Sequence, residues 1–301
     1  MRKVYGILVI IFCVVFTSIL LYITFFQPKS GVKKLSENSS TVVFNRKELK
    51  LRPHLPRKFI PKIEVKNLNL WGEKNGSELV GDDAIVLMGL RWKNITDAVE
   101  ERYMIEMGGL FGSMSRETDG IEFLGNAQND GGFGIIHIQP ATACEFGLKI
   151  FGNCKAMIDE KHSKNLKEKI EFFGPDYNKL IPLDDRFQPV YCLDAAGRII
   201  AFHMVGEKSF KEALGRYYGT NKSDIDGYVA EVKRYERFVN NPDSLEALRQ
   251  RFNAMNPDLF VNGKSADFDA YIKVYQDRNE ECFALAEYKK LPPPKTKEKE
   301  Q

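Results

Sequence analysis

The first clear feature of the hydrophobic pattern is an apolar run without a charged side chain at residues 4–26. In a helix, about 20 such residues cross a bilayer core of ~30 Å. A cleaved secretory signal is the alternative, but its apolar core is about 7–15 residues long and ends at small residues. Here Gln27, Pro28 and Lys29 follow the run. We therefore expect an uncleaved transmembrane helix at 4–26, after a cytoplasmic stub of residues 1–3.

Polar segments flank the rest of the chain. Residues 27–61 are rich in Lys, Ser, Asn and Pro, which predicts an extracytoplasmic tether with one short strand at most. Residues 291–301 contain three successive prolines and then mostly charged residues, which predicts a disordered tail. The domain between them is expected over residues 62–290, with its core at 96–240. It shows no repeat of fixed period, which excludes solenoids and propellers.

Within this domain, apolar residues recur at steps of three and four, the period of amphipathic helices. One helix is predicted from near Thr96 to near Gly120. Its apolar stripe consists of Val99, Tyr103, Met107, Leu110 and Met114. Further helices are predicted after Pro189, from the Ser209-Phe-Lys-Glu212 capping box, and over residues 224–239. Because strand patterns are few, we expect a mainly α fold with at most a small sheet.

Charge and cysteine content add little to this picture. The net charge of +3 comes from 44 basic and 41 acidic residues that are interspersed, so nucleic acid is not an expected partner. Cys13 lies in the apolar run, and the remaining four cysteines permit three pairings. A Cys144–Cys154 bridge is the simplest of these, and four buried free thiols are the alternative. No Cys/His spacing indicates a metal.

Glu117 is the candidate with the clearest chemistry. It follows Met114 by three residues and Leu110 by seven, so it lies on the apolar stripe of its predicted helix. In general, a carboxyl group pressed against apolar surface loses hydration of its charged form, which favours the protonated form that a general acid at neutral pH requires. A helix-end carboxylate turned toward solvent is the alternative interpretation.

Short motifs surround and follow Glu117. In chain order they are Ser115-Arg116-Glu117-Thr118, Gly131-Gly132-Phe133-Gly134, Pro140-Ala141-Thr142-Ala143, Gly147-Leu148, Ala213-Leu214-Gly215-Arg216-Tyr217-Tyr218-Gly219 and Tyr228-Val229. Together they resemble the goose-lysozyme-like lytic transglycosylases of the Slt type. That family carries a helix-ending Glu-Ser, a Gly-Ala-x-Gly-Leu-Met-Gln segment, Pro-x-Thr-Ala and a later Ala-Leu-x-x-Tyr segment. The resemblance covers roughly residues 96–235.

The resemblance and the residue chemistry together select the substrate-binding candidates. Gly132 and Gly134 let the backbone approach a sugar ring, although a Gly-Gly-x-Gly sequence is also common in plain turns. Pro140 and Gly147 suit the start and the end of a helix. Tyr217 is a candidate for hydrogen bonding near Glu117, and an aromatic core residue is the alternative reading.

The chain departs from the family pattern at two places. Thr118 replaces the serine after the glutamate, which keeps the hydroxyl group and adds a methyl group. Counting from Gly134, His137 stands where the family has glutamine, and Gln139 follows two residues later. Either His137 or Gln139 is expected to take the role of that glutamine in binding an acetamido sugar.

The resemblance implies an all-α, lysozyme-like domain that cleaves peptidoglycan glycan strands. The bond would be the β(1→4) link from N-acetylmuramic acid to N-acetylglucosamine, with Glu117 as single acid/base and a 1,6-anhydro product. It implies no metal or organic cofactor, a bacterial cytoplasmic (inner) membrane location, and a domain facing the periplasm or cell exterior. A cell-envelope machine is a further candidate partner.

Three other interpretations stay open. A hydrolytic muramidase would need a second carboxylate, and the nearest in sequence are Asp119, Glu122 and Asp130. A wall-binding scaffold without turnover would fit the His137 departure. A eukaryotic membrane glycoprotein would fit the Asn-x-Ser/Thr triplets, which begin at Asn38, Asn75, Asn94 and Asn221.

Overall fold

The computed structural model describes residues 44–56, 58–70, 79–125, 130–154, 160–205, 209–218 and 222–296. The predicted transmembrane helix at 4–26 and residues 27–43 of the predicted tether lie outside these ranges. Within them, no helix is long and apolar enough to cross a bilayer. All the described residues belong to one unit, which begins at Val43.

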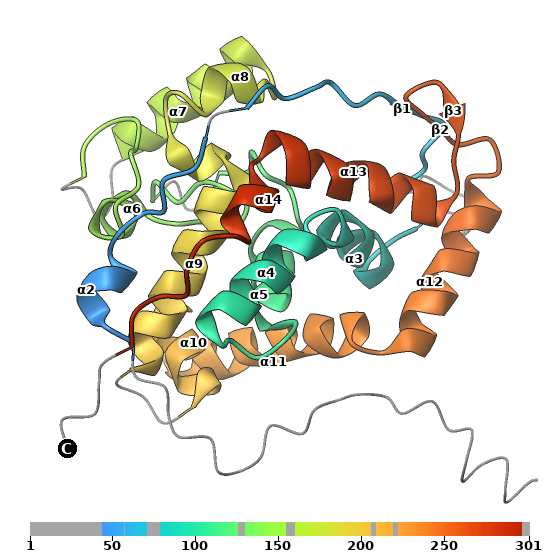
Figure 1. The fold of residues 1–301 in the computed structure, drawn as a ribbon. Helices are drawn as coiled ribbons and strands as arrows, with labels where there is room; N and C mark the ends of the chain where they lie inside the picture. The colour runs from blue at the N-terminus through green and yellow to red at the C-terminus, as the bar shows by residue number, and fades with distance from the viewer. Residues whose placement is uncertain are drawn as a thin grey trace, which may run out of the picture. The chain divides into compact units, whose positions relative to one another are not determined.

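The described part is mainly helical, as the three-and-four spacing predicts (Figure 1). The longer helices are α3 (Asp82–Leu90), α4 (Lys93–Tyr103), α5 (Gly109–Thr118), α7 (Glu160–Phe173), α9 (Pro189–Met204), α10 (Phe210–Tyr218), α11 (Lys222–Val239), α12 (Pro242–Met255) and α13 (Phe268–Cys282). Short helical turns are α2 (Arg46–Leu49), α6 (Pro140–Glu145), α8 (Tyr177–Leu180), η1 (Asp185–Phe187) and α14 (Leu285–Tyr288). Helix α5 packs against α3, α4, α9 and α11, so it is central to the unit.

The expected small sheet is present. Three antiparallel strands of two residues each pair in the order β1 (Val65–Lys66), β2 (Phe260–Val261) and β3 (Lys264–Ser265). Asn262 and Gly263 connect β2 to β3 with positive φ at both positions, as a tight two-residue hairpin turn requires. The sheet therefore attaches the segment before α3 to the segment between α12 and α13.

Local signals identify several helix ends correctly. The backbone N–H of Glu212 donates to Ser209 Oγ at 3.2 Å, which is half of the predicted capping box. Pro140 is the first residue of α6, and Gly147 follows its end with φ of +75°. The helix predicted after Pro189 is α9, and most of its residues are buried.

The single helix predicted from Thr96 to Gly120 is wrong, because the chain breaks between α4 and α5. Met104 and Gly108 have positive φ, and Met107 is 48% exposed although it keeps the apolar period. The buried Glu100 carboxylate accepts hydrogen bonds from the N–H groups of Gly108 and Leu110, both at 2.7 Å. Because these N–H groups have no partner within the new helix, Glu100 caps the start of α5.

The predicted tether and tail boundaries also need correction. Phe44, Leu49 and Leu55 are at most 5% exposed and belong to the main core, so the folded unit begins well before residue 62. The backbone N–H of Asn45 donates to the carbonyl oxygen of Lys295 at 3.0 Å, which fixes residues 291–296 against the same segment. A few widely spaced apolar side chains attach these two segments to the core. Because the segments are polar in overall composition, the sequence alone does not indicate that they are folded. Residues 297–301 of the predicted tail lie outside the described residues.

The simplest of the possible cysteine pairings is the one present in the structure. Cys144 at the end of α6 forms a disulfide with Cys154, while Cys192 and Cys282 are free and buried. The bridge closes a short loop next to the segment that carries Pro140. It therefore supports the chain that follows the glycine-rich motif.

Candidate active site

Glu117 lies near the end of α5, at the edge of the core. Its side chain is 18% exposed, whereas Leu110 and Met114 on the same stripe are fully buried. The helix ends because Asp119 and Gly120 both have positive φ. Glu117 therefore lies between the two expectations, at the end of the apolar stripe with its carboxylate within reach of solvent.

The chain after Glu117 is held from two directions. The carbonyl oxygen of Gly120 accepts hydrogen bonds from Trp92 Nε1 at 2.9 Å and from Arg91 Nη2 at 3.1 Å. The Thr118 hydroxyl donates to the carbonyl oxygen of Ile135 at 2.7 Å. The end of α5 is thus attached both to the α3–α4 corner and to the glycine-rich loop.

His137 brings the glycine-rich loop into contact with Glu117. Its Nδ1 lies 3.5 Å from Glu117 Oε2, and its side chain is 8% exposed. Its φ is +39°, an unusual value for a residue with a side chain. Nε2 is buried and has no hydrogen-bond partner among the described residues. A buried polar atom of this kind needs a hydrogen-bond partner, which a ligand or a water molecule can supply.

A buried ion pair holds the loop in shape. The Arg186 guanidinium donates to the carbonyl oxygens of Gly131 at 2.7 Å and Ile138 at 2.8 Å, and it pairs with Asp184 at 2.8 Å. Gly134 lies against the same residue: an added Cβ would meet the Arg186 carbonyl oxygen at 2.5 Å. The close approach and the φ of +89° explain why glycine is needed there.

The other two candidates on the loop are joined through Asp130. Its carboxylate accepts hydrogen bonds from the N–H of Gly132 at 2.9 Å and from Gln139 Nε2 at 2.8 Å. The Gln139 amide group is thus engaged with Asp130, and of the two residues proposed for the glutamine role it is His137 that contacts Glu117. Gly132 contributes its backbone to the fold of the loop.

Two tyrosines complete the surroundings of Glu117. Tyr217 donates its hydroxyl to the carbonyl oxygen of Ile136 at 2.7 Å. The pKa values of Tyr217 and Tyr228 lie well above the usual value. Burial is the larger cause, and the negative charge of Glu117 is the second. The buried Tyr228 hydroxyl has no partner of good hydrogen-bond geometry among the described residues. Both side chains therefore stay neutral. Tyr228 offers its O–H group near the carboxylate, whereas Tyr217 already donates its hydroxyl proton to Ile136.

Two of the neighbouring carboxylates, Glu122 and Asp130, have other partners. Glu122 accepts the Tyr177 hydroxyl and lies 3.6 Å from Arg91, while Asp130 supports the loop. Burial raises the pKa of Asp119, against the opposing charge of Arg116. Glu117 is thus the carboxylate that combines partial exposure with histidine and tyrosine neighbours.

The ion pair that supports the glycine-rich loop was not predictable from the sequence. The Asp184–Arg186 pair lies more than forty residues after the loop that it holds, and a two-residue Asp/Arg spacing carries no signal of its own. Comparison with protein families, curated proteins and solved structures gives no match. Function is therefore inferred from the residues around Glu117.

Proposed function

We propose that this protein is a membrane-anchored lytic transglycosylase that cleaves peptidoglycan glycan strands, with Glu117 as its single acid/base. The observation that carries the proposal is the contact between the half-buried Glu117 and His137 on the glycine-rich loop. The helical architecture is compatible with the lysozyme-like fold that belongs to this proposal. The apolar run at 4–26 would anchor the domain outside the cytoplasmic membrane.

The reaction needs one group that first gives a proton and then takes one. Glu117 protonates the glycosidic oxygen while the bond from that oxygen to C1 of the muramoyl residue breaks. The C6 hydroxyl of the same residue then attacks C1 and transfers its proton to Glu117, which closes the 1,6-anhydro ring and regenerates the acid. No water is consumed.

The surroundings support this use of a single carboxylate. A retaining or inverting hydrolase needs a second carboxyl group at a defined separation from the first. Glu122 and Asp130 are held by other side chains or backbone groups. The neutral Tyr228 hydroxyl is suited to stabilising a charged transition state without adding a charge.

The test is digestion of purified peptidoglycan by the full-length protein in mild detergent, followed by mass spectrometry of the released fragments. Wild type should release fragments ending in 1,6-anhydromuramic acid. Glu117→Gln keeps the shape but removes the transferable proton, so release should fall at least ~100-fold. Glu101→Gln, which changes an exposed carboxylate on α4, is the matched control and should keep full activity.

Different results would select other functions. Fragments that have gained water at the reducing end would identify a hydrolytic muramidase. Binding to peptidoglycan without release of any fragment would identify a scaffold. Unchanged release by Glu117→Gln, with normal circular dichroism, would remove Glu117 from the mechanism.

A further inference from the structure

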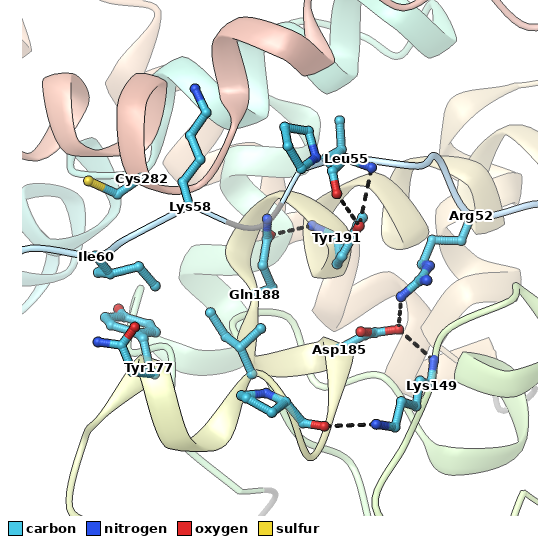
Figure 2. A pocket seen from close by; sticks show the side chains of 14 residues that line it. Arg52, Leu55, Lys58, Ile60, Lys149, Tyr177, Asp185, Gln188, Tyr191 and Cys282 are labelled. Atoms are coloured by element: carbon cyan, nitrogen blue, oxygen red, sulfur yellow. Dashed lines mark hydrogen bonds and ion pairs between the residues drawn. The ribbon is translucent and has the colours of Figure 1, made fainter.

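A hollow of about 210 Å³ is lined by residues of the segments 52–56 and 58–60, of α8 and of the turn around η1 (Figure 2). The residues grouped around Glu117 do not line it. Figure 2 shows Arg52, Asp185 and Lys149 together on one side of the hollow, with Ile60 and Tyr177 on the other. The hollow therefore has one charged end and one mainly apolar end.

At the charged end, the two cations Arg52 and Lys149 face the single carboxylate of Asp185. The Asp185 carboxylate accepts hydrogen bonds from the Arg52 guanidinium and, at 2.6 Å, from the backbone N–H of Lys149. Lys149 Nζ donates to the carbonyl oxygen of Pro182 at 2.8 Å, which leaves its charge without a carboxylate partner in the described part of the chain. An ammonium group has three N–H donors and a guanidinium has five. A ligand here should bring acceptor oxygens with a negative charge.

The walls of the hollow are already fixed. The Gln188 side chain donates to the carbonyl oxygen of Phe283 at 3.0 Å and accepts the N–H of Tyr191 at 2.8 Å. The Tyr191 hydroxyl accepts the N–H of Leu55 at 3.3 Å, which attaches the segment 52–56. Lys58 points away from the charged end and pairs with Glu287 (Figure 2). Such preformed walls reduce the ordering cost of binding.

We propose that this hollow binds a small carboxylate with an apolar body. The ligand carboxylate accepts from Lys149 Nζ and from those N–H groups of Arg52 that Asp185 does not engage, and the body extends toward Ile60 and Tyr177. The end of a short peptide and a short acyl chain share this chemistry. The inference depends on the hollow alone and goes beyond glycan cleavage at Glu117.

The test is isothermal titration of the full-length protein in detergent with hexanoate and with N-acetylalanine. Hexanamide controls for the apolar body without the charge, and hexyl phosphate controls for a different anion. The decisive variant is Lys149→Gln, because this exposed side chain donates to a carbonyl oxygen and its loss should spare the fold. Lys179→Gln on α8 is the matched control, since Lys179 is also exposed and does not line the hollow.

We expect saturable binding of hexanoate, of N-acetylalanine or of both. Tighter binding of hexanoate would indicate an acyl chain as the ligand, and tighter binding of N-acetylalanine would indicate the end of a peptide. Lys149→Gln should weaken that binding about tenfold or more, and Lys179→Gln should leave it unchanged. No saturable binding, equal binding of hexanamide, tighter binding of hexyl phosphate, or insensitivity to Lys149→Gln would each overturn the proposal. Glu117→Gln should bind like wild type, so failure of glycan cleavage and failure of this site are distinguishable.

Discussion

Replacement of Gly134 by alanine tests whether the glycine-rich loop is shaped by close packing. Gly134 has φ of +89°, and an alanine Cβ would lie 2.5 Å from the Arg186 carbonyl oxygen and 2.7 Å from Cys192 Sγ. Neither neighbour yields easily, because one atom is backbone and Cys192 is fully buried in α9. The loop or η1 must therefore shift.

The expected loss of stability has two parts. The left-handed conformation costs a residue with a side chain about 1–2 kcal/mol. Insertion of an extra methyl group into a well-packed core costs about 1–3 kcal/mol. Gly134→Ala should therefore lower the free energy of unfolding by about 2–5 kcal/mol, and it should also reduce glycan release because the loop carries His137.

Gly263→Ala is a matched control in the β2–β3 turn. Its φ is +76°, and nothing lies within 4 Å of the added Cβ, so only the conformational cost applies. Urea unfolding followed by circular dichroism measures both variants, with equal slopes as the check on two-state behaviour. If Gly134→Ala is no less stable than Gly263→Ala, then the close packing described for the loop is incorrect.

Further predictions concern stability, the catalytic loop and topology. Because burial raises the pKa of Glu100 to about 7, above its unfolded value, its contribution to stability is lost as pH rises through about 7. Glu100→Gln should flatten that pH dependence in urea titrations. Cys144→Ser should lower the free energy of unfolding by about 2–4 kcal/mol, unless Cys154 is already free in non-reducing peptide maps. His137→Gln, which restores the residue of the resembled family, should keep glycan release within about tenfold of wild type, whereas His137→Ala should raise KM more than it lowers kcat. A C-terminal reporter that is active only in the cytoplasm should give no signal, and a bright one would reject the topology.

Elements with strong local signals were predictable from the sequence. Pro140 and Gly147 bound α6, and the Ser209 capping box opens α10, because these signals act over a few residues. Glu117 and His137 were predictable as candidates because their motifs are local too. Their contact, by contrast, depends on how α5 and the loop meet.

Features made by distant residues were not predictable. Met107 keeps the apolar period across the break between α4 and α5. Gly108-Gly109 is a local signal for the break, but the capping of α5 by the Glu100 carboxylate is visible only in the structure. The Asp184–Arg186 pair under the loop and the burial of Phe44 likewise depend on contacts across the chain. Periodicity and composition carry no information about such contacts.

Because α5 is attached at both of its ends, we expect the site around Glu117 to unfold together with the rest of the unit. Glu100 accepts N–H groups at the start of the helix, and Arg91 and Trp92 hold the Gly120 carbonyl oxygen just beyond its end. Fraying, which usually begins at helix ends, would have to break these buried hydrogen bonds first. The amides of α5 should therefore exchange with solvent only when the whole unit unfolds, and heat should inactivate Glu117 at the temperature of global unfolding rather than below it.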